Sequence, residues 1–171
     1  KELGSCQFLL PVAESIDTDM IKQKLGANPL NIKLIHGETY DVMNTCDTLI
    51  IASGSATLEA GIIGCPMVIV YKLSPLTYWL ALRLVNTPYY GLVNIVAGEG
   101  VAPELIQSEA NAENIAAETL KFLKNPKHCQ EVRDRLLRVR KNLGSPGVMK
   151  AVASSMADSL SKITPHEKIS L

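Results

Sequence analysis

Small hydroxyl residues and a glycine follow an apolar run in residues 47–72, DTLIIASGSATLEAGIIGCPMVIVYK. Ser53, Ser55 and Thr57 offer hydroxyl groups, and Gly54 allows a ligand to approach the backbone closely. A helix that begins here would favour an anion at its N-terminus by about 0.3–1 kcal/mol. The segment therefore predicts a diphosphate-binding loop. The residues alone leave open the alternative that Ser55 or Thr57 only caps the helix.

Glu59 is the only charged residue in the helical segment SATLEAGIIG. If Ser55 is the N-cap, Glu59 lies one position beyond the acid of a capping box, so that motif does not explain it. A carboxylate one step from a phosphate site can accept hydrogen bonds from two vicinal ribose hydroxyls. We interpret Glu59 as a ribose ligand. The alternative is a favourable acid in the first helical turn that has no partner.

Other chemical motifs are missing or have simpler explanations. No strand is followed by GxGxxG, and GxxxxGK[ST] does not occur, so neither a dinucleotide-dependent dehydrogenase nor a P-loop enzyme is supported. Asp17 and Asp19 resemble a metal-binding DxD pair, but they precede a helical segment, and we expect Asp17 or Thr18 to be its N-cap. The three histidines lack metal-ligand spacing, so no metal or other cofactor is expected.

Composition indicates an ordinary globular chain of 171 residues, 47% hydrophobic and 20% charged. Lys plus Arg and Asp plus Glu both number 17, so no overall field favours nucleic acid, and a phosphate site must be built locally. The four cysteines contain no CxxC pair, which favours reduced, partly buried thiols in a cytoplasmic protein over a disulfide framework. No apolar stretch reaches the length of a membrane-spanning helix.

Apolar runs rich in Val, Ile and Leu predict strands at residues 8–13, 32–37, 48–53 and 67–72. Each pair of runs encloses a segment long enough for two or three helical turns. Alternation of this kind predicts βαβ units and an α/β fold with a Rossmann-like parallel sheet flanked by helices.

The pattern loosens after Lys72. The segment SPLTYWLALRLV begins with a Ser-Pro helix entry, and one further strand is possible at residues 91–96. From residue 111 onward only helices are predicted, so we divide the chain into a Rossmann-like domain at 1–110 and a helical C-terminal arm at 111–171. The first residue is Lys1, and a strand follows almost at once, so we expect a fragment whose N-terminal part is missing.

Residues 52–107 closely resemble the lipid-A-disaccharide synthase family. The blocks SPLTYWLA, NIVAG and PELIQ carry the match through their order and spacing, and LGSPGVMKAVA at 143–153 resembles the closing element of the family, with Val148 in place of the usual Ala. The resemblance implies the C-terminal, donor-binding half of an inverting GT-B glycosyltransferase. Such an enzyme joins UDP-2,3-diacylglucosamine to 2,3-diacylglucosamine 1-phosphate in lipid A biosynthesis and releases UDP.

The same resemblance implies roles for particular residues. The loop at 53–57 would face the UDP phosphates and Glu59 the ribose, while Asn94, Glu104 and Gln107 would border the donor sugar. The catalytic residues are expected in the missing N-terminal half, together with a Gly-Ser-Arg loop that contacts the donor. The resemblance further implies a peripheral location on the cytoplasmic side of the inner membrane of a Gram-negative-type bacterium, and it allows a homodimer.

Two alternatives remain from the sequence. UDP-sugar 2-epimerases and other GT-B transferases share a Ser/Gly loop followed by a ribose-binding Glu, and a non-catalytic nucleotide-binding or dimerisation module is also possible. The segment around Tyr78 and Trp79, with Leu76, Leu80, Leu82 and Leu84, either touches a bilayer surface or packs on the body or over the donor cleft. We favour packing, because only Lys72 and Arg83 supply positive charge nearby.

Overall fold

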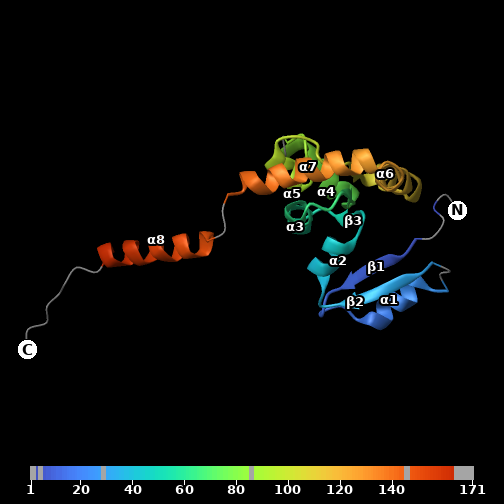
Figure 1. Ribbon diagram of the computed structural model, residues 1–171, viewed down its shortest axis with the longest axis horizontal. Coiled ribbons are helices and arrows are strands. Elements are labelled where there is room, and N and C mark those ends of the chain that lie inside the picture. The colour runs from blue at the N-terminus through green and yellow to red at the C-terminus, as the bar shows by residue number, and fades with distance from the viewer. Residues whose placement is uncertain (1–2, 4–5, 28–29, 85–86, 145–146, 164–171) are drawn as a thin grey trace, which may run out of the picture. The chain divides into compact units, whose positions relative to one another are not determined.

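The structure is a computed structural model that describes residues 3, 6–27, 30–84, 87–144 and 147–163. Strands and helices alternate through the first half of the chain, and helices follow (Figure 1). The elements are β1 (Phe8–Val12), α1 (Thr18–Leu25), β2 (Ile32–His36), α2 (Thr39–Thr45), β3 (Leu49–Ala52), α3 (Ser55–Ile63), β4 (Met67–Tyr71), α4 (Pro75–Leu84), α5 (Leu92–Ala97), β5 (Glu104–Ile106), a 3-10 helix (Gln107–Glu109), α6 (Ala112–Lys124), α7 (Pro126–Asn142) and α8 (Val148–Ile163).

Every strand pairing in the described residues is parallel. β1 pairs with β2, while β3, β4 and β5 form a second sheet in that order. The predicted α/β class with parallel strands and flanking helices is therefore confirmed, and all four predicted runs are strands. The strands nevertheless form two separate sheets, whereas we predicted one.

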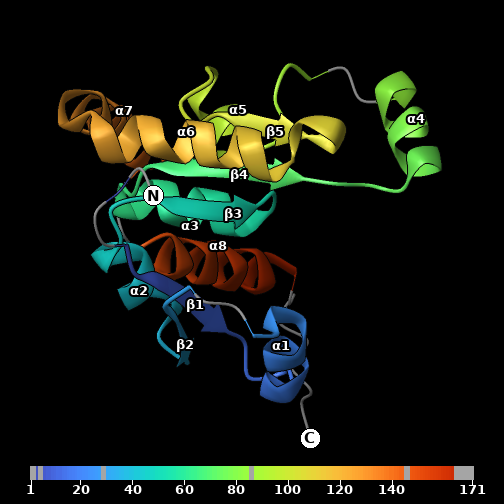
Figure 2. The ribbon, with the colours of Figure 1, turned by 90° about the vertical axis from the view of Figure 1, so that its right-hand side faces the viewer.

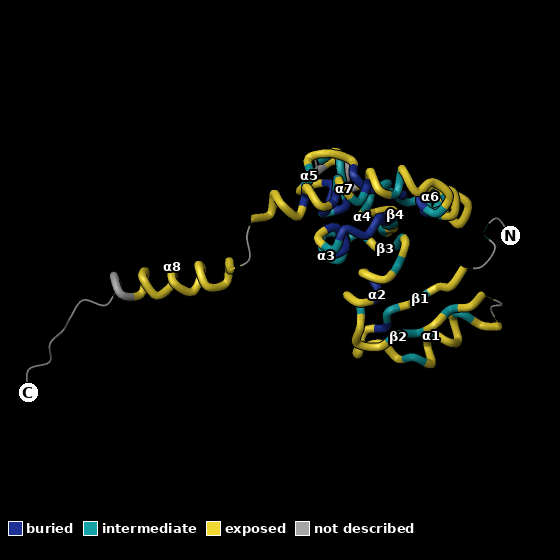
Figure 3. Tube along the Cα trace, in the orientation of Figure 1, coloured by how far each residue is buried: buried dark blue, intermediate teal, exposed yellow. Residues whose placement is uncertain are grey.

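β4 lies at the centre of the core. Met67, Val68 and Ile69 are 0% exposed, because β4 has a paired strand on each side and helices above and below. α3 covers one face of this sheet and α6 the other (Figure 2). The buried part of the chain in Figure 3 is concentrated around these elements.

The strand expected at residues 91–96 is wrong, because these residues belong to α5. Gly91 is the N-cap and Gly98 ends the helix in the left-handed conformation, at φ 70°. The β-branched residues suggested a strand, but the helix buries Val93 and Asn94 on one face. Tertiary packing has overridden the local propensity here. The last strand lies later, at β5.

The compact body of the chain extends beyond the boundary that we placed at residue 110. One unit covers Lys1–Arg140, and a second covers Lys141–Leu171. α6 and α7 belong to the first unit because Phe122, Val132, Leu136 and Val139 join the same core as β4. α8 in the second unit is exposed along its described side chains, including Met149 and Leu160.

Two predicted helix starts are confirmed. The Asp17 carboxylate accepts the Asp19 backbone N–H at 2.9 Å and caps α1. α4 begins at Pro75, and the Ser74 hydroxyl accepts the Thr77 N–H at 3.2 Å.

The packing that we expected for α4 is observed only in part: Tyr78 is half-buried, whereas Leu76 and Trp79 are exposed. Leu76 is 75% exposed and Trp79 is 50% exposed, with the Arg83 guanidinium 3.9 Å from the Trp79 ring centre. The side chains of Leu80, Leu82 and Leu84 lie outside the described residues. Among the described helices, none is both long and apolar enough to cross a bilayer.

Two adjacent leucines of α7 test whether this helix belongs to the body. Leu136 is 0% exposed and Leu137 is 45% exposed. We expect Leu136→Ala to lower the free energy of unfolding by about 2–5 kcal/mol, because it leaves a cavity in the core. Leu137→Ala, the matched control, should cost about 1 kcal/mol or less. Urea denaturation of the two variants measures the difference, and equal losses would place α7 outside the core.

Candidate functional site

The loop between β3 and α3 leaves a helix N-terminus open to solvent. Gly54 is the N-cap of α3, and no side chain caps the helix. Ser55 is the first helical residue and is exposed. A Cβ on Gly54 would meet no atom of the described residues within 4 Å, so the packing of the protein does not require glycine there. The first N–H groups of a helix have no partner within it. This end of α3 therefore has room for an anion.

The hydroxyl groups of Ser53 and Thr57 stabilise this loop by donating hydrogen bonds to backbone carbonyls. The Ser53 hydroxyl donates to the Tyr90 carbonyl at 2.9 Å. Thr57 is fully buried, and its hydroxyl donates to the Gly54 carbonyl at 2.8 Å. A bond to a carbonyl does not cap the N-terminus, so the capping alternative for Ser55 or Thr57 is wrong. Of the three residues, Ser55 is exposed, Ser53 is half-buried and Thr57 is buried.

Glu59 lies on the same face of α3 as Ser55. The two residues are four apart, which places them one above the other, with about 6 Å between them along the helix axis. Glu59 is half-buried, and Tyr40 of α2 is exposed beside it. Hydrogen bonding to Glu59 and its negative charge raise the pKa of the Tyr40 phenol above its ordinary value. The lone acid of the segment is therefore next to a polar neighbour at the surface and is not enclosed in apolar packing.

Asn94 and Glu104 form a polar network beside this loop. Asn94 is 1% exposed, and its amide nitrogen donates to the Ala102 carbonyl and to the Glu104 carboxylate, both at 2.8 Å. Its amide oxygen accepts the N–H groups of Val101 and Ala102 at 2.9 Å. These four bonds use the full hydrogen-bonding capacity of the side chain. Asn94 therefore holds the segment before β5 in place.

Glu104 in turn fixes the turn that precedes α5. Its carboxylate accepts the N–H groups of Tyr90 and Gly91, both at 2.8 Å. A Cβ on Gly91 would meet the end of the buried Ile69 side chain, which would have to shift to accommodate it. The Tyr90 carbonyl accepts the Ser53 hydroxyl, so the network connects β5 to the start of α3.

Gln107 joins the end of β5 to the loop after β4. Its side chain accepts the Leu73 N–H at 2.8 Å and donates to the Leu73 carbonyl at 3.1 Å. The residue has φ 51°, a left-handed conformation that costs about 1–2 kcal/mol for a residue with a side chain. Because these two bonds hold Gln107 in that conformation, its backbone is a constrained point at the sheet edge.

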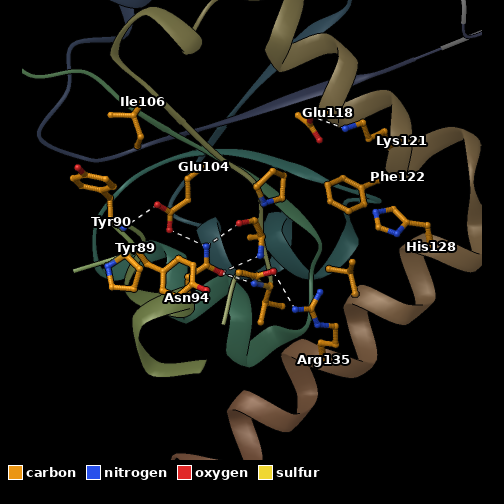
Figure 4. Close-up of a pocket in the computed structure, with 16 residues that line it drawn as sticks. Tyr89, Tyr90, Asn94, Glu104, Ile106, Glu118, Lys121, Phe122, His128 and Arg135 are labelled. Carbon is orange, nitrogen blue, oxygen red and sulfur yellow. Dashed lines mark hydrogen bonds and ion pairs between the residues drawn. The ribbon is translucent and has the colours of Figure 1, made fainter. Parts of the chain in front are cut away.

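A broad cavity of about 600 Å³ adjoins the network on the side of α6 and α7 (Figure 4). Tyr89, Asn94 and Glu104 border it on one side, and Phe122 and His128 border it on the other. The rings of Phe122 and His128 stack at 5.4 Å. Of the predicted donor-binding residues, only Asn94 and Glu104 line this cavity, and the other predicted residues are at the open end of α3, in its first turns or beside Leu73.

Two residues near the open end of α3 were missed as ligand-site candidates. Lys72 directly follows β4, whose carboxyl end lies beside that of β3 because Ala52 aligns with Val70. Lys72 was the last residue of the strand predicted at 67–72, and this position was a usable signal, because parallel strands end at the same sheet edge. Tyr40 gave no such signal, because its contact with Glu59 joins two helices that are separate in the sequence.

The four cysteines are free thiols of different exposure. Cys65 is buried and Cys46 and Cys129 are half-buried, whereas Cys6 is exposed although we expected it to be partly buried. Burial raises the pKa of the Cys65 thiol to about 12, so this residue remains a neutral thiol at physiological pH.

The parallel α/β body, with a loop and an open helix N-terminus after β3, is a Rossmann-like fold of the kind found in one half of a GT-B protein. A family model described as lipid-A-disaccharide synthetase matches residues 1–157. The chain belongs to this family.

Curated relatives support the same assignment. The lipid-A-disaccharide synthase of Geobacter metallireducens is 46% identical over 91% of this chain and 41% of its own length. That of Geobacter sulfurreducens is 43% identical with the same coverage, and that of Syntrophus aciditrophicus is 43% identical over 86% of this chain and 39% of its own length. The chain thus spans about 41% of the length of the relatives that it matches, and it corresponds to their C-terminal portion.

The contact between Tyr40 and Glu59 can be tested by titration. Glu59→Gln removes the negative charge that disfavours the phenolate, so we expect the pKa of Tyr40 to fall toward its ordinary value. Phenolate absorbance measures this, with Tyr40→Phe identifying the signal. Glu38→Gln, a change on a glutamate just before α2, is the control and should leave the titration unchanged. An unaltered Tyr40 pKa in Glu59→Gln would show that the two side chains do not interact.

Proposed function

We propose that this chain is the nucleotide-sugar-binding portion of a lipid-A-disaccharide synthase. The complete enzyme would transfer 2,3-diacylglucosamine from its UDP donor to 2,3-diacylglucosamine 1-phosphate and release UDP. The observation that carries the proposal is the open N-terminus of α3, with Ser55 and Glu59 on one face, in a member of this family. Family membership supports a glycosyltransferase.

The residues at the sheet edge suit the separate parts of UDP. The N–H groups at the start of α3 and the Ser55 hydroxyl would bind the diphosphate, and the open space at Gly54 would admit it. Lys72, exposed at the end of the neighbouring strand, would supply a positive charge. Glu59 lies one helical turn away and would accept the ribose hydroxyls, with Tyr40 holding its carboxylate in place.

The inverting transfer would require a base for the acceptor hydroxyl and stabilisation of the departing UDP. This chain would provide the second through main-chain N–H groups and Lys72, so the proposal calls for no metal. Asn94, Glu104 and Gln107 would act by positioning, because their hydrogen bonds hold the loops that surround the donor. The base would come from the portion of the enzyme that precedes this chain.

Contact with the inner membrane surface is a further part of the proposal. The acyl chains of both substrates would reside in the bilayer. Leu76 and Trp79 expose apolar surface on α4, and Arg83 stacks over Trp79, a combination that suits a lipid interface. The proposal places the enzyme at the cytoplasmic face as a peripheral protein.

Ribose recognition is tested by pairing a protein change with a ligand change. Hydrogen bonds to a charged group contribute about 1.5–3 kcal/mol, so Glu59→Ala should weaken UDP binding roughly 10- to 100-fold. Native protein should lose a similar factor with 2′,3′-dideoxy-UDP, and Glu59→Ala should lose nothing more with that ligand. Isothermal titration calorimetry provides the four affinities.

The control is Glu113→Ala, which removes an acid from the first turn of α6. It should leave UDP affinity unchanged. If native protein binds UDP and dideoxy-UDP equally, Glu59 does not hold the ribose. Absence of any UDP binding would favour a non-catalytic module, and equal binding of UDP-N-acetylglucosamine and UDP-2,3-diacylglucosamine would favour another UDP-sugar enzyme.

The chain alone should not catalyse transfer, since the proposal assigns the base to the preceding portion. We expect no disaccharide when it is incubated with both substrates, as measured by mass spectrometry of the lipid product. The complete Geobacter metallireducens synthase in the same assay is the positive control. Disaccharide formation by this chain would place the base within residues 1–171.

A further inference from the structure

The cavity beside β5, α6 and α7 has charged residues around it, but these residues bind one another. The Glu118 carboxylate pairs with Lys121 at 2.6 Å. The Arg135 guanidinium pairs with Glu99 at 3.1 Å and donates to the Gly100 carbonyl at 3.0 Å. Among the residues that the structure describes, no buried side-chain nitrogen or oxygen lacks a hydrogen-bond partner. The cavity therefore offers a ligand no unpaired buried polar side chain.

The rest of the cavity wall is mostly apolar. It includes Tyr89, Val101, Pro103, Ile106, Phe122 and Val132 (Figure 4). Asn94 and Glu104 also line it, but their polar atoms already bond to the turn before α5 and to the segment before β5. The volume of about 600 Å³ lies within the range of roughly 300–1,000 Å³ that is typical of small-molecule sites. Such a cavity favours a hydrocarbon over a strongly hydrated ligand, because burying an unpaired polar group is costly.

Tyr90 connects this cavity to the loop after β3. The residue lines the cavity, and its backbone carbonyl accepts the Ser53 hydroxyl at 2.9 Å. Ser53 precedes Gly54, the N-cap of the helix end that we assign to the diphosphate. From Tyr90 the cavity extends toward the stacked rings of Phe122 and His128 (Figure 4). A ligand held at the start of α3 would therefore have an apolar cavity beside it.

We propose that this cavity binds one acyl chain of the donor lipid. The inference rests on the proposed function, because it takes UDP-2,3-diacylglucosamine as the ligand whose diphosphate lies at the start of α3. Before binding, both acyl chains lie in the bilayer. On binding, one chain would pass Tyr90 and enter the cavity, where Phe122 is 4% exposed and Val132 is 3% exposed. The chain would exchange one apolar environment for another, so leaving the bilayer would cost little.

Gly100 makes it possible to fill the cavity without removing a core residue. It lines the cavity, and a Cβ there would lie 3.5 Å from the Tyr89 ring, which is an ordinary contact. Its φ is outside the left-handed region, so the backbone accepts a side chain. Gly100→Leu should therefore occupy part of the space proposed for the acyl chain. Ala116→Leu is the matched control, because Ala116 is exposed on α6 and does not line the cavity.

The test compares donor analogues that differ only in the length of their acyl chains. The ligands are UDP and UDP-2,3-diacylglucosamine with four-carbon or eight-carbon acyl chains, and isothermal titration calorimetry gives their affinities. Each methylene that becomes buried should tighten binding about fourfold, so we expect the eight-carbon donor to bind roughly tenfold or more tightly than the four-carbon donor. Gly100→Leu should reduce this ratio to about threefold or less and leave UDP affinity unchanged, whereas Ala116→Leu should retain the full ratio.

A second pair of variants controls for altered packing at Gly100. His128→Glu places a carboxylate in the cavity wall near the start of α7, where an acid is compatible with the helix, and should lower the same ratio. Gln130→Glu makes the same charge change at an exposed position outside the cavity and should leave the ratio unchanged. All variants must retain the native circular dichroism spectrum to be compared.

Three results would overturn the proposal. The first is equal affinity of the two acylated donors for the native chain. The second is an unchanged ratio in both Gly100→Leu and His128→Glu, which would place the acyl chain elsewhere. The third is octanoate that binds as tightly as the eight-carbon donor, which would assign the cavity to free fatty acids. Absence of UDP binding would count against the proposed function as well, whereas a missing chain-length effect with normal UDP binding would count against the acyl-chain site alone.

Discussion

The arrangement of the candidate site depends on the hydrogen bonds of the Glu104 carboxylate. This carboxylate accepts hydrogen bonds from the backbone N–H groups of Tyr90 and Gly91 and from the side-chain amide of Asn94, all at 2.8 Å. Because the Tyr90 carbonyl accepts the Ser53 hydroxyl, the start of α3 is anchored to the last strand of the sheet. A polar network with this many satisfied bonds rigidifies its surroundings, since opening it would leave buried groups unpaired.

The polar residues of the candidate site fall into two groups, one buried and one exposed. Asn94 and Thr57 are buried with their bonds made inside the protein, whereas Ser55, Glu59 and Lys72 retain exposed surface. The hydrogen bonds of the buried residues, Asn94 and Thr57, fix the loops that carry the exposed residues. In the proposed donor site, a change to Ser55, Glu59 or Lys72 would weaken ligand binding without altering the surrounding loops, whereas a change to Asn94 or Thr57 would alter the loops as well.

A second constraint comes from the hydrogen bonding of parallel strands. A strand in such a sheet is satisfied only when both edges are paired and both faces are covered, as for β4. In the part of the chain that the structure describes, β1 and β3 are each paired along one edge, and β3 leads directly into the loop that carries Ser53 and Gly54.

Local patterns in the sequence determined the four long apolar strands, the helix starts at Asp17 and Pro75 and the loop after β3, because each depends on residues close together in the chain. Tertiary structure alone decided that residues 92–97 are helical, since Val93 and Asn94 are buried there while Ile95 and Val96 stay exposed. Tertiary structure alone also packed α6 and α7 against the core and brought Tyr40 next to Glu59. The burial of Thr57 and Asn94 has the same origin. These outcomes depend on which distant backbone groups and apolar surfaces meet, and residue order does not specify that by itself.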